Sequence, residues 1–303
     1  MNGSRILAIG TSAEGSVGNA AGRALANLLN EKSPLRAEAR PTSGHSVLLP
    51  QVNDGGLDLG IANVLEVAEA LRGDGVFAGR RQSNIRALCV LFPNRTGLFV
   101  RASSGIRSIA DLKGKSVSYG FSAMTSMTRL VLAILANGGL SLEGVKPVSV
   151  ANANGGIDAL LEGTVDAFYS SPGAGRVAHA DKMVGGLRML SLSTGEDAIA
   201  AMQRIVPEAF ALETLPQPGL TGVREPIQAL AYDLPLLVGT QLEDDVVYRI
   251  MATMAEHRRH LVRALADYHA FLPEKMARPV PCSYHPGAIR YYQEHGLWPP
   301  KAT

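Results

Sequence analysis

Short apolar runs alternate with stretches of helical periodicity along the first hundred residues. Residues 6–9 form an apolar run typical of a buried strand, and apolar residues then recur at helical spacing from Ala20 to Leu29. Further strands are predicted at 36–40, 57–62 and 85–92, with a helix that opens at residues 42–46. Pro50 lies in that helix, and we expect it in the first turn, where its missing N–H is not needed. This alternation predicts a parallel α/β sheet.

The same pattern returns later in the chain. Strands are predicted at 115–119, 145–150 and 165–169, with a helix through 127–135. The loop after the first strand of each stretch reads Ser-Ala-x-x-Ser, at Ser12 and at Ser122. Asp58 and Asp166 each open a strand after a glycine that ends a helix. We therefore predict an α/β fold of two similar lobes, each a mainly parallel sheet flanked by helices, joined by crossing strands around a ligand cleft. A chance likeness of two strand-to-helix turns is the alternative.

Composition narrows the class of protein without naming a function. Apolar residues make up 46% of the 303 residues, charged residues make up 18%, and the net charge is +2. This balance is that of an ordinary globular protein, with no basic run that would favour a nucleic-acid partner. No apolar run approaches the ~20 residues of a membrane helix. Cys89 lies in an apolar run typical of a buried thiol, and its pairing with Cys282 stays open.

The two serine-containing loops are the candidate binding elements. A helix N-terminus carries unpaired N–H groups and a partial positive charge, so two such starts facing one cleft would hold an anionic group. Helix capping alone explains each serine equally well. Glu14 points to solvent or pairs with a cationic group on the ligand. The predicted ligand contacts are Ser12, Glu14, Ser16, His45, Asn63, Ser122, Thr125 and Ser126.

Signatures of catalysis are absent from the sequence. The chain has no G-x-S-x-G motif and no phosphate-binding Walker loop. His257 and His260 are spaced like metal ligands, but no Glu or Cys partner accompanies them, and an exposed helix face is favoured. We expect no catalytic residue, no cofactor and no metal. A Ser–His–Asp set assembled in space stays open. A long helix is predicted over residues 242–265, with acidic residues in its first turn.

Several motifs together resemble one family of receptors. The narrowest is C-terminal, at residues 281–292, and includes His-Pro-Gly-Ala-Ile-Arg-Tyr-Tyr. The broader ones are Ile9-Gly10-Thr11, Thr42-Ser43-Gly44-His45-Ser46-Val47, Gly60-Ile61-Ala62-Asn63 and the segment 108–115. Nearly the whole chain resembles the TAXI group of TRAP-transporter solute receptors, which have a type II periplasmic-binding-protein fold.

The resemblance implies a periplasmic receptor, with its signal peptide removed, that closes on a small organic acid or amino acid and delivers it to a TRAP membrane permease. It implies a first lobe of residues 1–94 and 233–303 and a second lobe of residues 95–232, with crossing strands near 94–100 and 228–238. Ser12 stands where relatives have a glycine, and Gly18-Asn19 where they have two tyrosines, which favours a larger or less polar acid. Two alternatives are an enzyme on the same scaffold, similar to thiamine-pyrimidine synthases, and a cytoplasmic small-molecule sensor. The candidate loops contain no lysine, which disfavours Schiff-base chemistry.

Overall fold

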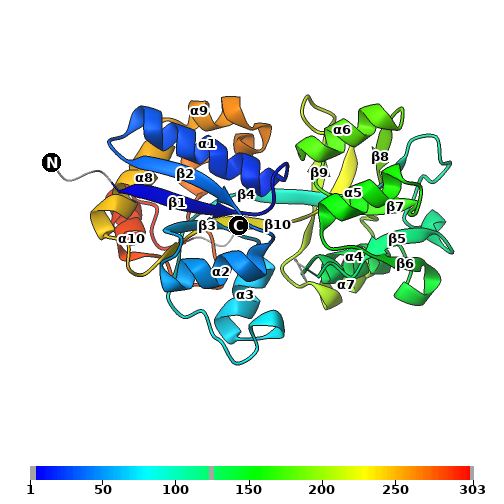
Figure 1. The fold of residues 1–303 in the computed structure, drawn as a ribbon, viewed down its shortest axis with the longest axis horizontal. Helices are drawn as coiled ribbons and strands as arrows, with labels where there is room; N and C mark the ends of the chain where they lie inside the picture. The colour runs from blue at the N-terminus through cyan, green and yellow to red at the C-terminus, as the bar shows by residue number, and fades with distance from the viewer. Residues whose placement is uncertain (1–4, 123–125, 301–303) are drawn as a thin grey trace. The chain divides into compact units, whose positions relative to one another are not determined.

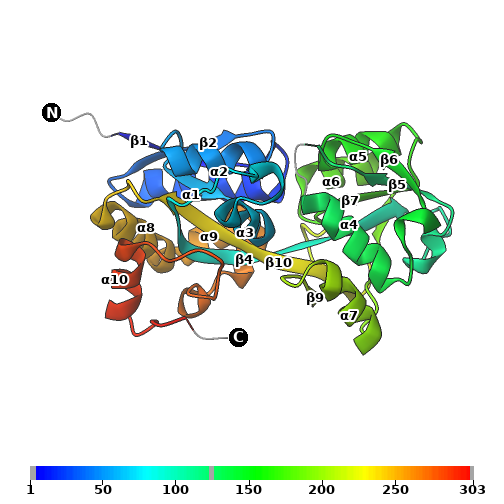
Figure 2. The same cartoon turned by 90° about the horizontal axis from the view of Figure 1, so that it is seen from below.

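The computed structural model describes residues 5–122 and 126–300, which form two compact units (Figures 1 and 2). The first unit comprises residues 1–14, 18–93 and 233–303, and the second comprises residues 15–17 and 94–232. Two long strands, β4 (Ile85–Arg101) and β10 (Ile227–Gly239), contribute residues to both units. They coincide with the predicted crossing strands, and the α/β fold is confirmed.

The first unit is built on a sheet whose central strand is β1 (Ile6–Thr11). Parallel strands β2 (Arg36–Pro41) and β3 (Leu59–Ile61) flank it, and β10 runs antiparallel beside β3. Ile6 pairs with the residue thirty positions on, and Ile9 with the residue fifty positions on. A helix follows each of these strands; the three are α1 (Val17–Lys32), α2 (His45–Asp54) and α3 (Val64–Arg72).

The second unit repeats this sheet. Strand β5 (Ser116–Tyr119) lies between parallel strands β6 (Lys146–Ser149) and β7 (Ala167–Ser170), and β4 runs antiparallel beside β7. Ser116 again pairs thirty positions on and Val117 fifty positions on. The following helices are α4 (Ser126–Asn137), α5 (Ala153–Leu161) and α6 (Gly175–Met183). The two sheets therefore have the same pairing intervals, and β3 and β7 open at Leu59 and Ala167, which gives an offset of 108 residues between the sheets.

One aspartate makes the same connection in each unit. Asp58, just before β3, donates its N–H to the Ala8 carbonyl at 3.0 Å, and its Oδ2 accepts the Ala8 N–H at 2.8 Å. Asp166, just before β7, bonds Ser116 in the same two ways, each at 2.9 Å. Each aspartate thereby links two adjacent parallel strands just before the regular backbone pairing between them begins. The predicted correspondence of Asp58 and Asp166 is confirmed.

The remaining elements complete the two units. Strands β8 (Leu187–Met189) and β9 (Phe210–Thr214) pair with β4 and β10 respectively, and α7 (Glu196–Ile205) packs on α4. In the first unit, α8 (Asp244–Glu256) packs on α10 (Pro286–Glu294), with α9 (Arg258–Ala264) between them in sequence. Single 3-10 turns lie at Gly75–Phe77, Ala110–Leu112, Leu142–Gly144, Ala266–Ala270 and Pro273–Lys275.

The C-terminal motif anchors its segment to β4 of the first unit. Tyr292 is fully buried and donates its hydroxyl to the Leu88 carbonyl at 2.6 Å. His285 precedes α10 and accepts the Gly287 N–H on its Nδ1 at 3.2 Å, as an N-cap. Tyr284 forms a parallel bridge with β4. These contacts give the motif a structural role in the first unit.

Two details of the predicted helices are wrong. The single helix over residues 242–265 is two helices, because the chain turns out of helical geometry at His257. A run of polar residues there ends the apolar periodicity. Pro50 is the sixth residue of α2, beyond the first turn. The helix continues past this proline because Leu48, Leu49 and Val52, on either side of it, are fully buried.

Cys89 and Cys282 are both buried and both free, so the open question of their pairing is answered. Burial raises the pKa of the Cys89 thiol far above its usual range and that of Cys282 to about 12. No helix in the described part of the chain is long and apolar enough to cross a membrane.

Candidate functional site

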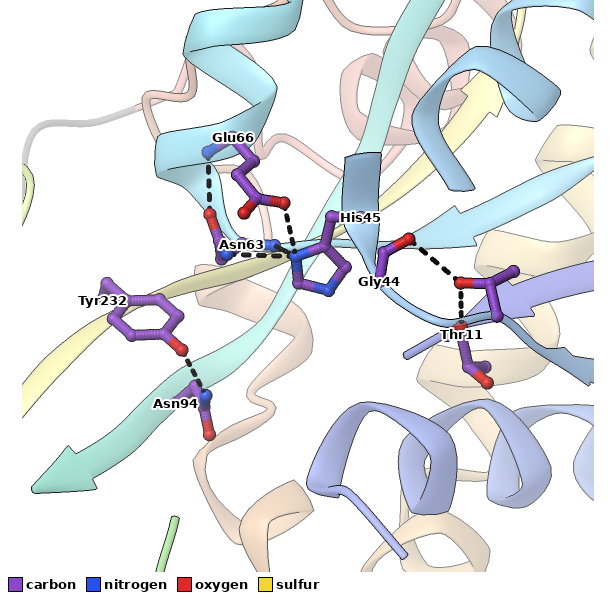
Figure 3. A network of polar contacts seen from close by, with 8 residues as sticks. Thr11, Gly44, His45, Asn63, Glu66, Asn94 and Tyr232 are labelled. Carbon is purple, nitrogen blue, oxygen red and sulfur yellow. Dashed lines mark hydrogen bonds and ion pairs between the residues drawn. The ribbon is translucent and has the colours of Figure 1, made fainter. Parts of the chain in front are cut away.

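Three strands of the first unit end at the same edge of the sheet. Because β1, β2 and β3 are parallel and adjacent, the loops that follow them lie together. Thr42, after β2, donates its N–H and its hydroxyl to the Thr11 carbonyl, each at 2.9 Å. The Thr42 hydroxyl also lies 3.1 Å from the Gly44 carbonyl oxygen (Figure 3). The loop that enters α2 is thereby tied to the end of β1.

A buried polar cluster joins the loop after β3 to the start of α2 (Figure 3). Asn63 caps α3, since its Oδ1 accepts the Glu66 N–H at 2.7 Å. The Nδ1 atom of His45 lies 3.0 Å from Asn63 Nδ2, 3.4 Å from Asn63 N and 3.3 Å from Glu66 Oε2. The side chain of His45 is 4% exposed and that of Glu66 is 0% exposed. An imidazole and a carboxyl group therefore share one side of a cluster closed off from water.

Helix α2 begins beside this cluster without a capping side chain of its own. Its N-cap is Gly44, which has no side chain, and His45 is the first residue of the helix. The positive end of the helix dipole therefore lies at this sheet edge without a capping side chain. Such an arrangement can receive an anionic or strongly polar oxygen.

The predicted contacts of the first unit divide into two groups. Ser12, His45 and Asn63 are buried and follow the ends of β1, β2 and β3, so the structure brings them to one edge. Ser16, which belongs to residues 15–17 of the second unit, is half-buried just before α1. Glu14 is exposed and lines a hollow of about 350 Å³ between α1 and the edge strand β2, together with Asn19, Arg23, Asn27, Asn30 and Glu38 among others.

The predicted contacts of the second unit lie around the start of α4. Ser126 is its first residue and is fully buried. Ser122 is exposed and follows Gly120, whose φ of +68° favours glycine. Thr125 lies outside the described residues. At the 108-residue offset Ser12 corresponds to Gly120, so the second loop runs two residues further before its serine.

Sequence reasoning did not identify Glu66 or the polar cluster of Asn94. Asn94, on β4, donates its Nδ2 to the Tyr232 hydroxyl at 2.8 Å and accepts the Ser171 hydroxyl on Oδ1 at 3.2 Å (Figure 3). Glu66 could have been found, because Asn63-x-x-Glu66 is the spacing of a capping box. Among residues 5–122 and 126–300, His, Cys, Asp and Glu form no group that could hold a metal ion.

The repeated α/β units and their polar strand ends define a solute-binding-protein fold. The chain belongs to the NMT1-like family, whose model matches residues 9–296. Its structure is similar to the alkanesulfonate-binding protein SsuA from Xanthomonas axonopodis pv. citri bound to MOPS, with 19% identity, a TM-score of 0.50, and coverage of 95% of this chain and 83% of that one. It is also similar to the ligand-binding component of an ABC-type import system from Staphylococcus aureus, with 14% identity, a TM-score of 0.55 and coverage of 98% and 94%.

A third neighbour is a TctC solute-binding protein from Polaromonas, with 15% identity, a TM-score of 0.51 and coverage of 88% of this chain and 90% of that one. At identities this low, the similarity shows a shared fold alone. All three neighbours bind solutes or ligands, so the chain has the fold of extracytoplasmic solute-binding proteins.

Proposed function

We propose that this protein is a periplasmic receptor that binds a small organic acid or amino acid and delivers it to a TRAP-type permease. The observation that carries the proposal is the carboxyl edge of the first unit, where α2 starts without a side-chain cap beside the buried His45. An anionic solute would be stabilised by the positive end of this helix. The assignment to a TRAP system rests on the C-terminal motif at residues 281–292 and its resemblance to TAXI receptors.

The ligand contacts are proposed separately for each unit. In the first unit they are Ser12, His45 and Asn63, with Glu14 on the flank, where it would meet an amino group of an amino-acid ligand. Ser16, just before α1, is a further contact and belongs to residues 15–17 of the second unit. In the second unit they are Ser122, Ser126 and Thr125, around the start of α4. We assign no catalytic residue, cofactor or metal, and no nucleic-acid partner.

An enzyme on the same scaffold is the second candidate. One observation favours it, because a buried carboxyl group beside an imidazole is the arrangement that activates a histidine as a general base. The two candidates differ in what happens to the solute: a receptor releases it unchanged, and an enzyme converts it.

A ligand screen tests the proposal. The purified protein is heated with organic acids, sulfonates and amino acids, and a compound at one hundred times its dissociation constant should stabilise the fold by about 2.7 kcal/mol. The hit is then recovered and examined for chemical change. Ser12→Ala should weaken binding of the hit, whereas Ser33→Ala, after the far end of α1, should leave it unchanged. A converted compound, or stabilisation by none of the acids and amino acids, would contradict the receptor.

A further inference from the structure

The protonation of His45 can be worked out from its neighbours. The Oδ1 atom of Asn63 accepts the backbone N–H of Glu66 at 2.7 Å, and a backbone N–H can only donate. This bond fixes the orientation of the Asn63 amide, so the atom that faces His45 is the NH₂ nitrogen, Nδ2. The side chain and the backbone of Asn63 thus both present N–H groups to His45 Nδ1, at 3.0 and 3.4 Å.

Two donors at Nδ1 require a lone pair there. A neutral imidazole with its lone pair on Nδ1 carries its hydrogen on Nε2. Glu66 Oε2 lies 3.3 Å from the same nitrogen but outside hydrogen-bond geometry, so the two Asn63 donors define the lone pair on Nδ1. An imidazolium ring would likewise carry a hydrogen on Nε2. Only a neutral ring protonated on Nδ1 would leave Nε2 without a hydrogen. In that state the Nδ1–H donor would face the two N–H donors of Asn63, which is unfavourable.

The Nε2 atom is on the opposite side of the ring from Asn63 and Glu66 (Figure 3). Within residues 5–122 and 126–300, every hydrogen bond and ion pair of the His45 side chain goes through Nδ1. The side chain is 4% exposed, so a donor with no partner is held in an almost closed setting. It belongs to the first residue of α2, whose positive end has no capping side chain. In the second unit, by contrast, Asn152 caps α5 with its own side chain.

We infer that His45 Nε2–H is a fixed hydrogen-bond donor for an oxyanion of the ligand, a carboxylate or a sulfonate. Asn63 and Glu66 are the positioning residues that hold the ring in this state. This inference rests on the proposed function. It also distinguishes a receptor from an enzyme, since a histidine that donates from Nε2 cannot accept a proton there. The site is thereby suited to binding an anion and unsuited to general-base chemistry through His45.

The tautomer can be measured without any ligand. Nitrogen-15 NMR of histidine-labelled protein should show the His45 ring protonated on Nε2, with the resonance assigned by its loss in His45→Gln. His285→Asn, which removes another buried histidine of the first unit, provides the assignment control. A neutral His45 protonated on Nδ1 with a bare Nε2 would overturn the inference. Asn63→Asp, which removes the Nδ2 donors, should shift the ring towards that state.

The ligand class is tested with succinate and methanesulfonate as carboxylate and sulfonate probes and 1,4-diaminobutane as the cationic control. At least one anionic probe should move the His45 Nε2–H resonance, and the diamine should not. His45→Phe, which keeps a ring and removes the donor, should weaken that probe about tenfold or more, and His45→Gln should retain part of the affinity. An Nε2–H ring that neither anion perturbs would overturn the oxyanion assignment. Failure of the proposed function would show differently, as conversion of a ligand or as no stabilising compound in the wider screen.

Discussion

The repeated aspartates offer a direct test of how burial sets the strength of a hydrogen bond. Asp58 is 4% exposed and accepts one hydrogen bond on Oδ2, from the buried N–H of Ala8 at 2.8 Å. Its ion pair with Arg5 adds little, because the arginine side chain is 66% exposed. Asp58→Ala leaves the Ala8 N–H buried without an acceptor, which costs about 2–3 kcal/mol in free energy of unfolding. Asp58→Asn keeps an acceptor and should cost less.

Asp166 is the matched control, because it occupies the equivalent position and its carboxylate, like that of Asp58, accepts two hydrogen bonds. Its Oδ2 takes both the N–H and the hydroxyl of Ser116, each at 2.9 Å, but the aspartate is exposed. Water can replace it, so Asp166→Ala should cost about 1 kcal/mol or less. Counting accepted hydrogen bonds would predict equal losses of stability, which is what makes the pair informative.

Urea unfolding provides the measurement. Far-UV circular dichroism follows both units, and the fluorescence of Trp298, the chain's single tryptophan, follows the first. We expect Asp58→Ala to lower the midpoint of both transitions, and Asp166→Ala to lower the circular dichroism midpoint by much less. If Asp166→Ala lost as much stability as Asp58→Ala, the argument from burial would be refuted.

Three further predictions concern pH, packing and thiol reactivity. Burial lowers the pKa of His285 below 6.5, so the contribution of His285 to stability is complete above that pH and is lost as the pH falls through the folded-state pKa. His285→Asn keeps an N-cap and should flatten this part of the curve of stability against pH. An unchanged curve would contradict the prediction. Gly22→Ala places a Cβ 2.3 Å from the methyl carbon of Thr11 on β1 and should lower the free energy of unfolding by about 1–3 kcal/mol, measured by thermal unfolding. In the control Gly175→Ala the new Cβ meets no atom within 4 Å, so this variant should be neutral or slightly stabilising. Equal effects of the two variants would contradict the argument from packing. Cys89 and Cys282 should react with a thiol reagent only on unfolding, and a fast reaction of the native protein would show that they are accessible.

Much of the fold could be predicted because its strands are short apolar runs separated by glycines and helical periodicity. The strands β1 to β3 and β5 to β7 follow from that pattern, whereas the crossing strands were implied by the family resemblance. The break at His257 and the continuation of α2 through Pro50 could not, because tertiary packing decides both against local propensity.

The candidate site was predictable only in part. The shared edge of Ser12, His45 and Asn63 could be predicted because strand ends in a parallel sheet meet at one edge. Their role as ligand contacts stays a prediction. Glu66 was missed because helical periodicity places it on a face of α3 without revealing that the face turns towards His45. The pairing of His45 with Glu66 depends on the packing of two helices, and no local pattern encodes it.

The repeat also separates the residues that serve the fold from those that do not. Asp58 and Asp166 occupy equivalent positions and make equivalent bonds, so they belong to the architecture. At the same offset, His45 corresponds to Ala153, the first residue of α5. Glu66, the third residue of α3, corresponds by its place in the helix to Val177, the third residue of α6. The second unit forms the same sheet and the equivalent helices with alanine and valine at these two positions. An ionisable pair that the fold can do without, and that costs free energy to bury, is best explained by what the first unit binds.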